Sequence, residues 1–267
     1  MNNFIVTNEA IIRLIAFLAI ITIMAIWETR KPIMTLSISK KQRWMNNFGL
    51  VALNVIILRI LFPTAAVGAA IFATKHSWGL FNNITLSSWI TVIISLIIMD
   101  MLIYFQHRIF HKIPILWRLH LVHHADLDYD LSTGLRFHPI EIILSMLIKF
   151  AIILLLGVPI IAVILFEIIL SSLAIFNHSN ISFPKKLDRI LRWFVVTPDM
   201  HRVHHSVEID ETNSNYGFNL PWWDRLFNSY REQTRATNIT IGLPEYRKPQ
   251  QVYGIIQMLR LPFNRVS

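Results

Sequence analysis

The sequence contains no cysteine among its 267 residues. Disulfide bridges, thiolate-held iron–sulfur clusters and cysteine nucleophiles are therefore excluded. Charged residues are also scarce, at 15% of the chain, whereas the residues AVILMFWYC make up 54%. A soluble domain carries about 25% charged residues, and a disordered chain combines high charge with low hydrophobicity. The composition therefore predicts an integral membrane protein.

The positive net charge of the chain bears on whether it binds nucleic acid. A net charge of +9 would suggest nucleic-acid binding in a soluble protein. In a membrane protein, lysine and arginine instead border the spans on the cytoplasmic side. We therefore expect the membrane, and no nucleic acid, as a partner.

Apolar runs of about 18 residues or more, long enough to cross the hydrocarbon core of a bilayer, recur along the chain. They occupy residues 10–27, 48–73, 88–105 and 139–176. The last run is interrupted by Gly157, Val158 and Pro159, which predicts two antiparallel helices joined by a tight turn. The expected fold is an all-α integral membrane protein with about four transmembrane helices and a histidine-rich cap.

The basic residues also predict the orientation of the spans. The loop after the first apolar run contains Arg30, Lys31, Lys40, Lys41 and Arg43. The loop after the second run contains only Lys75. The first loop is therefore expected in the cytoplasm and the N-terminus outside. On this topology the histidine-rich segments described next all lie on the cytoplasmic side.

Ten of the eleven histidines lie between His107 and His205, and the remaining one, His76, falls in the opposite loop. They form the runs HRIFH, HLVHH and HRVHH, with two further single histidines. Positions three and four apart share a face of a helix, and neutral imidazole is a common metal ligand. Ten nitrogens suit two metals with about five ligands each. The candidate ligands are His107, His111, His120, His123, His124, His138, His178, His201, His204 and His205.

Two common metal motifs are absent. The chain has no HExxH, so a zincin-type peptidase has no support. No glutamate is followed by histidine three residues later, so the soluble carboxylate di-iron bundle has none either. Imidazole suits iron, zinc and copper alike, and the residues alone leave the metal open.

Three aspartates are candidates for orienting the imidazoles. Asp100 precedes His107 by two helical turns, within an apolar run where charge is rare. Asp126 and Asp199 flank the second and third histidine runs. The alternatives are a structural ion pair for Asp100 and solvated loop positions for the other two.

The hairpin predicts two contacts by symmetry about Val158. His138 and His178 are equally far from the turn, so both are expected at the cytoplasmic end beside the other histidines. Lys149 and Glu167 are also equidistant, and an ion pair between them would relieve the cost of charge near mid-membrane. The alternatives are that Lys149 snorkels or that Glu167 pairs with Arg59.

The motifs taken together carry a resemblance. The runs HRIFH, RLHLVHHAD, LRFHPIE, FNHSN and TPDMHRVHHS, followed by SNYGFNLPWWDRLF, stand in this order between residues 100 and 246. In these motifs the chain resembles the fatty acid hydroxylase / sterol desaturase superfamily of membrane di-iron enzymes, and most of all bacterial sterol desaturase family proteins. The first two spans share only general hydrophobicity with that family.

The resemblance implies an O2-dependent oxidoreductase that hydroxylates or desaturates a C–H bond of a lipid, such as a sterol or a fatty acyl chain. Its cofactors would be two iron ions held by the ten histidines. Residues 1–87 would form a two-span membrane region, residues 88–246 the catalytic domain and residues 247–267 a tail. The expected location is the bacterial inner membrane, with the site facing the cytoplasm. Electrons would come from a separate ferredoxin-like or cytochrome b5-like donor with its reductase.

Two rival functions remain open at this stage. A zinc-dependent membrane hydrolase of a lipid would use its metal to lower the pKa of bound water. A metal or haem carrier would have no turnover at all. Strict dependence on O2 and a reductant separates the oxygenase from the hydrolase, and a haem absorption band would support the carrier.

Overall fold

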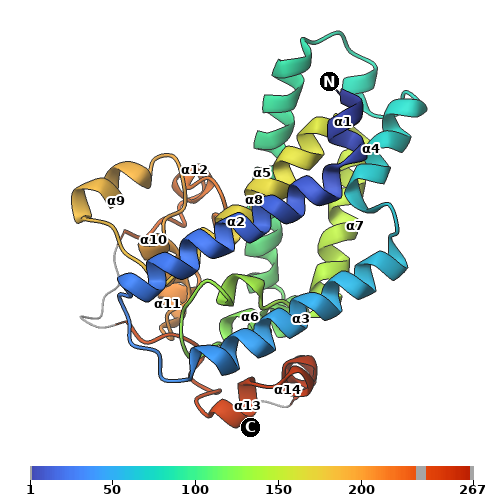
Figure 1. Cartoon of the computed structure of the whole chain (residues 1–267). Coiled ribbons are helices and arrows are strands. Elements are labelled where there is room, and N and C mark those ends of the chain that lie inside the picture. The colour runs from blue at the N-terminus through green and yellow to red at the C-terminus, as the bar shows by residue number, and fades with distance from the viewer. Residues whose placement is uncertain (1, 233–238, 265–267) are drawn as a thin grey trace.

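The computed structural model describes residues 2–232 and 239–264, and Figure 1 shows their arrangement. Within these residues the regular structure is helical, apart from one antiparallel bridge between Ser206 and Ile241. This confirms the expected all-α fold. The helices are α1 (Asn2–Thr7), α2 (Glu9–Arg30), α3 (Lys40–Leu61), α4 (Ala65–Lys75), η1 (Leu80–Asn82), α5 (Ser88–Lys112), α6 (Pro114–His124), η2 (Thr133–Leu135), α7 (Pro139–Leu156), α8 (Ile160–Asn177), α9 (Lys185–Leu191), α10 (Pro198–His204), α11 (Ile209–Thr212), α12 (Trp222–Leu226), α13 (Pro249–Val252), α14 (Ile255–Arg260) and η3 (Leu261–Phe263).

Five segments of the described chain are long and apolar enough to cross a membrane, against the expected count of about four. They are α2, the α3–α4 region from Lys40 to Asn82, α5, α7 and α8. The second apolar run is not one continuous helix, because α3 ends at Leu61 and α4 begins at Ala65. Pro63 lies between them, and proline interrupts a helix because it lacks the backbone N–H. The several apolar helices indicate a multi-pass membrane protein.

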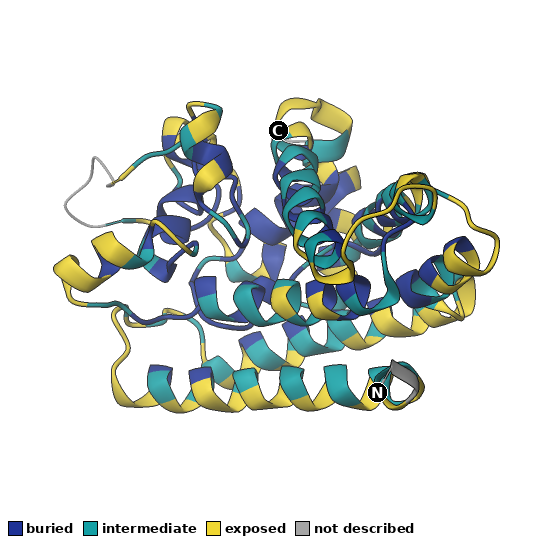
Figure 2. Cartoon of the chain, turned by 90° about the horizontal axis from the view of Figure 1, so that it is seen from above, coloured by how far each residue is buried: buried dark blue, intermediate teal, exposed yellow. Residues whose placement is uncertain are grey.

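The outer surface of these helices fits a lipid environment. Figure 2 shows α2, the long helix that follows the short N-terminal α1, as mostly exposed or half-exposed along its length. Only Met24 and Glu28 of α2 are buried, whereas large apolar side chains such as Leu14 and Leu18 are exposed. A surface of this kind is suited to lipid, in which the helix satisfies its own backbone hydrogen bonds.

The α7–α8 hairpin forms as predicted. Gly157 ends α7 in the left-handed conformation, with φ +66°. A Cβ atom at this position would lie 2.5 Å from Asn82 Nδ2 and 2.7 Å from the carbonyl oxygen of Trp78. The turn therefore needs glycine both for its backbone conformation and for the close approach of the η1 segment.

Within the hairpin, the predicted ion pair is confirmed. Lys149 Nζ lies 3.0 Å from Glu167 Oε1, and both side chains are buried. The sequence did not reveal a second partner, Arg13 of α2, whose Nη2 lies 2.7 Å from Glu167 Oε2. Arg59, the alternative partner, contacts the carbonyl oxygen of Pro63 at 3.5 Å instead.

Buried polar contacts tie the remaining chain to one end of these helices. Glu28, in the last turns of α2, accepts hydrogen bonds from the backbone N–H groups of Leu131 (2.7 Å) and Asn180 (2.8 Å). The fully buried Arg43 of α3 pairs with Asp126 and Asp130. Loop 125–138 is thereby held against α2 and α3, while α6, α10 and α11 gather near the C-terminal end of α5 (Figure 1).

Candidate metal centre

Nine of the ten candidate histidines come together in two groups. In each group, one nitrogen per ring lies within 4.8 Å of those of the other members. Eight of the nine rings belong to buried residues, and His111 is half-buried. The five-histidine group contains His107, His111, His120, His124 and His204, and the four-histidine group contains His123, His178, His201 and His205.

Helical spacing explains which ring joins which group. His107 and His111 lie one turn apart at the end of α5, and both belong to the five-histidine group. On α6, His120 and His124 are also one turn apart and join them, whereas His123 turns to the other group.

The third histidine run gives one ring to the five-histidine group and two to the four-histidine group, the reverse of the second run. His204, the last residue of α10, joins the five-histidine group, while His201 and His205 belong to the four-histidine group. Each HxxHH motif therefore supplies histidines to both groups, and His178 completes the second group from the C-cap of α8.

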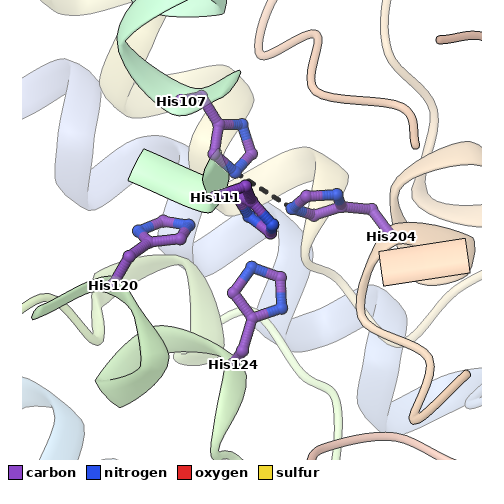
Figure 3. A group of neighbouring side chains, drawn as sticks. All are labelled: His107, His111, His120, His124 and His204. Carbon is purple, nitrogen blue, oxygen red and sulfur yellow. Dashed lines mark hydrogen bonds between the residues drawn. The ribbon is translucent and has the colours of Figure 1, made fainter. Parts of the chain in front are cut away.

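Hydrogen bonds define the tautomers of His107 and His204, which Figure 3 shows facing one another. His107 Nδ1 lies 2.8 Å from the carbonyl oxygen of Tyr216, and His204 Nδ1 lies 2.7 Å from that of Ser214. A carbonyl oxygen can only accept, so each neutral ring carries its proton on Nδ1. The two Nε2 atoms nevertheless lie 3.0 Å apart. Two lone pairs at that distance repel each other, and a cation coordinated by both relieves the repulsion.

The four-histidine group shows the same arrangement. His178 Nδ1 donates to the carbonyl oxygen of Ala174 at 2.7 Å, so its Nε2 carries the lone pair. That Nε2 lies 3.1 Å from Nε2 of His123 and of His201, and 3.2 Å from Nε2 of His205. Four ring nitrogens thus converge on one point. The donor set of each group fits a metal ion that takes imidazole ligands.

Burial keeps these rings in the form that binds metal. Removal from water lowers the pKa of His178 and of His204 to about 3. The same desolvation, reinforced by neighbouring imidazoles, lowers the pKa of His123 and His205. The rings are therefore neutral at pH 7, and a neutral imidazole has the lone pair that coordination requires.

A carboxylate beyond the three aspartates expected from the sequence holds one of the grouped rings. Glu141 Oε1 accepts a hydrogen bond from His120 Nδ1 at 2.7 Å, and both side chains are buried. A carboxylate in this position fixes the ring and makes its other nitrogen a stronger ligand. The available signal was a lone glutamate in the first turn of an apolar helix, three residues after His138.

The three aspartates expected to orient the imidazoles have other partners. Asp100 Oδ2 accepts from Trp223 Nε1 at 2.7 Å, and Asp199 Oδ2 from Ser182 Oγ at 2.6 Å. Asp126 accepts from the Tyr253 hydroxyl at 2.7 Å, besides pairing with Arg43. Within residues 2–232 and 239–264, none of the three bonds to a histidine ring. Asp100 instead connects α5 to α12, because the Trp223 indole that it binds belongs to α12.

His138 is the candidate ligand that the structure places outside both groups. It precedes Pro139, which favours an extended backbone, and it has φ −68° and ψ 140° as the N-cap of α7. Its Nδ1 accepts from the backbone N–H of Ile140 at 3.2 Å, and its Nε2 donates to the carbonyl oxygen of Leu259 at 3.2 Å. The ring therefore caps α7 and contacts α14, and it lies outside the group that contains His178.

Comparison with known proteins identifies the family. A family model described as fatty acid hydroxylase matches residues 92–229, which include all nine grouped histidines. The chain belongs to the fatty acid hydroxylase family. No solved structure matches it.

The chain is also similar to individual proteins that are named as a lipid hydroxylase and as alkylglycerol monooxygenases. The chain is 30% identical over 176 residues to ornithine lipid hydroxylase OlsE of Rhizobium tropici, an alignment that covers 65% of this chain and 50% of that protein. It is 29% identical over 188 residues to alkylglycerol monooxygenase of Xenopus tropicalis, covering 69% of this chain and 41% of the relative. The human alkylglycerol monooxygenase is 32% identical over 130 residues, covering 49% and 28%. The chain thus spans half or less of the length of these relatives.

In this member of the family, a cavity of about 310 Å³ lies beside the histidines, among α2, α3, α5, α7 and α8. At one end it is lined by Phe137, whose ring stacks on His123 with centroids 4.4 Å apart. Phe218, also in its wall, lies 6.4 Å from the ring of His178. The cavity extends to Lys149 and Glu167, within the spanning part of the hairpin. It therefore links the surroundings of the metal centre to the membrane-embedded helices.

Proposed function

We propose that this protein is an O2-dependent lipid hydroxylase that holds one iron ion in each histidine group. The observation that carries the proposal is the pair of groups whose ring nitrogens converge beside a cavity between apolar helices. The names of the relatives, a lipid hydroxylase and an alkylglycerol monooxygenase, favour hydroxylation over desaturation. They do not favour a sterol over other lipids.

The residues around the site have distinct tasks in this proposal. The carbonyl oxygens of Tyr216, Ser214 and Ala174 keep ring protons on Nδ1 and the lone pairs on Nε2. Glu141 holds His120 in place. Phe137 covers one flank of His123 and excludes water from it. These contacts hold the rings from outside the two groups and keep water away from them.

Iron bound at these residues would supply the reductive activation of O2 that an unreactive C–H bond requires. One oxygen atom enters the C–H bond to give an alcohol, and the other leaves as water with electrons and protons from a donor. Without cysteine the chain offers no iron–sulfur cluster of its own. We therefore assign the electrons to a separate carrier of the ferredoxin or cytochrome b5 type.

The same proposal places the site on the cytoplasmic side of the membrane, in a bacterium the inner membrane. The supporting observation is the basic loop between α2 and α3, which lies at the histidine end of the helices. Single cysteines at Ser37 and Lys75, both exposed, test this in a chain without other cysteines. Residue 37 should react only with reagents that reach the cytoplasm and residue 75 only from outside. Labelling of both from one side would refute the assignment.

The metal assignment is tested by elemental analysis and turnover together. The purified protein should hold about two iron ions per chain, one for each histidine group. His123→Ala and His204→Ala should each lose metal and lipid oxidation while the protein stays in the membrane. His76→Ala, an exposed position outside both groups, is the matched control. Full iron content in both variants would refute the assignment of iron to the histidine groups. Product formation without O2 and reductant would refute the oxygenase and favour the zinc hydrolase.

A further inference from the structure

Three acceptor oxygens in the wall of the cavity have no hydrogen-bond donor in the part of the chain that the structure describes. They are Asn54 Oδ1, Gln106 Oε1 and Glu141 Oε2. All three atoms are buried, and the Asn54 and Glu141 residues are only 6% and 4% exposed. A buried acceptor without a donor is unfavourable, because it has left water and gained nothing in exchange.

Two of these oxygens cannot turn away to find donors elsewhere. Asn54 Nδ2 donates to the carbonyl oxygen of Phe137 at 2.9 Å, which leaves Oδ1 as the free end of the amide. Glu141 is held through Oε1 by His120 Nδ1 at 2.7 Å. The free oxygens therefore belong to side chains that are already fixed from the other side.

The three acceptors come from three different helices. Each is next to one of the grouped histidines in sequence or is connected to one through side-chain contacts. Gln106 immediately precedes His107 on α5. Glu141 of α7 contacts His120, and Asn54 of α3 is bonded to Phe137, which stacks on His123.

Apolar side chains also line the cavity. Val55 and Leu58 of α3, with Ile142 and Leu170 of the hairpin, supply apolar walls. The Lys149–Glu167 pair borders the cavity roughly 12 Å from Glu141 along α7, at 1.5 Å per residue. The acceptors and the apolar wall together suit an amphiphile whose polar end carries donors and whose chain extends into the membrane region.

We propose that Asn54, Gln106 and Glu141 form a recognition site for the polar end of an amphiphilic lipid that donates hydrogen bonds through hydroxyl or amide N–H groups. The inference rests on the proposed function, in that the lipid bound here is the one oxidised. A cavity of about 310 Å³ is at the small end of ligand pockets and holds a polar end with the first part of a chain. The C–H bonds next to the polar end are then those nearest the histidines, and oxidation occurs there.

The test measures binding with the protein loaded with zinc, which occupies imidazole sites and is redox-inert. The probes are a long-chain monoalkyl glycerol ether, which has free hydroxyl groups, and the same ether with both hydroxyls methylated. Radioligand competition in detergent should show the hydroxylated ether binding roughly 5- to 100-fold more tightly, the range for pairing or stranding buried polar groups.

Asn54→Leu and Gln106→Met remove an acceptor each and should reduce this preference several-fold while binding of the methylated ether stays unchanged. Asn46→Leu is the matched control on α3, because the Asn46 amide bonds to Gln42 of its own helix. Zinc content reports folding of each variant. Equal binding of the two ethers by the unaltered protein, or a full preference in both variants, would overturn the inference. A preference without any oxidation in the iron-loaded protein would support the recognition site and refute the proposed hydroxylase.

Discussion

The cluster of Arg13, Lys149 and Glu167 within the spanning helices predicts that loss of the anion destabilises the protein more than loss of the lysine. Glu167 faces two cations, Lys149 at 3.0 Å and Arg13 at 2.7 Å. Lys149 has no second anion among the described residues, whereas Arg13 also contacts Glu9 at 3.2 Å. Removal of the anion therefore leaves Lys149 buried and unpaired, while removal of the lysine leaves Glu167 with Arg13.

The magnitudes follow from burial. Leaving one partner of a buried ion pair uncompensated costs about 3–5 kcal/mol, and Glu167→Gln should lower the free energy of unfolding by an amount in that range. Lys149→Met should cost less, about 1–2 kcal/mol, because Arg13 still pairs with the glutamate at 2.7 Å and no buried charge is left without a partner. The double variant with both changes should be more stable than Glu167→Gln alone, since it leaves no unpaired lysine.

The charge reversal adds a sharper criterion. Lys149→Glu combined with Glu167→Lys restores the pair but places the new lysine beside Arg13. Rescue should therefore be partial, and it should improve when Arg13→Gln is added. The assay is reversible unfolding in bicelles, with the coupling energy taken from the double-mutant cycle. If Lys149→Met is as damaging as Glu167→Gln, or if the cycle shows no coupling, the reasoning is refuted.

Three further predictions concern the centre and the hairpin. Glu141→Gln should lower metal affinity about 10- to 100-fold, measured by chelator competition, because a neutral amide is a poorer partner for the imidazole that it orients; an unchanged affinity would contradict this role. Metal-free protein should lose stability as pH falls below 6.5 toward 3, because unfolded His178 and His204 bind protons at about 6.5 while folded they do so only near pH 3. Between pH 7 and 5.5 each should cost about 1 kcal/mol in thermal unfolding, and a flat profile would show that the rings are not buried as neutral groups. Gly157→Ala should destabilise by more than about 1 kcal/mol because of its positive φ and the backbone carbonyl 2.7 Å from a Cβ, whereas helical Gly49→Ala, which meets only the flexible end of Ile255, should be nearly neutral; equal effects would refute the explanation of the turn.

Local pattern was sufficient for the helices and for most of the site. Gly157 and Pro159 between two apolar runs define the hairpin, because each acts on the backbone within one or two residues. Spacing of four residues likewise brings His107 with His111, and His120 with His124, into one group, whereas histidines three apart fall in different groups. Both the turn and the helical spacing depend on residues close together in sequence, so they can be predicted without knowledge of tertiary packing.

The misplaced residues depend on contacts between distant segments. The structure places His138 outside both histidine groups because the backbone before Pro139 turns its ring toward α14, more than a hundred residues later in the chain. Glu141 was overlooked because its partner belongs to α6, and the loop between them decides where α7 begins. Asp100 has the right helical phase to face His107, but the Trp223 indole competes for its carboxylate. Periodicity gives the direction of a side chain but not the identity of what it meets.

The division of the two HxxHH motifs between the groups has a consequence for how the centre is assembled. Because α6 and α10 each supply histidines to both groups, neither helix could move to bind an ion in one group without moving the ring nitrogens of the other. The first ion to bind thus meets the ordering cost of both helices, and the second finds its ligands already in place. Filling of the two positions should be cooperative, with half-filled molecules rare at every concentration of metal. The supply of metal in the cell would then determine what fraction of the molecules has both groups filled.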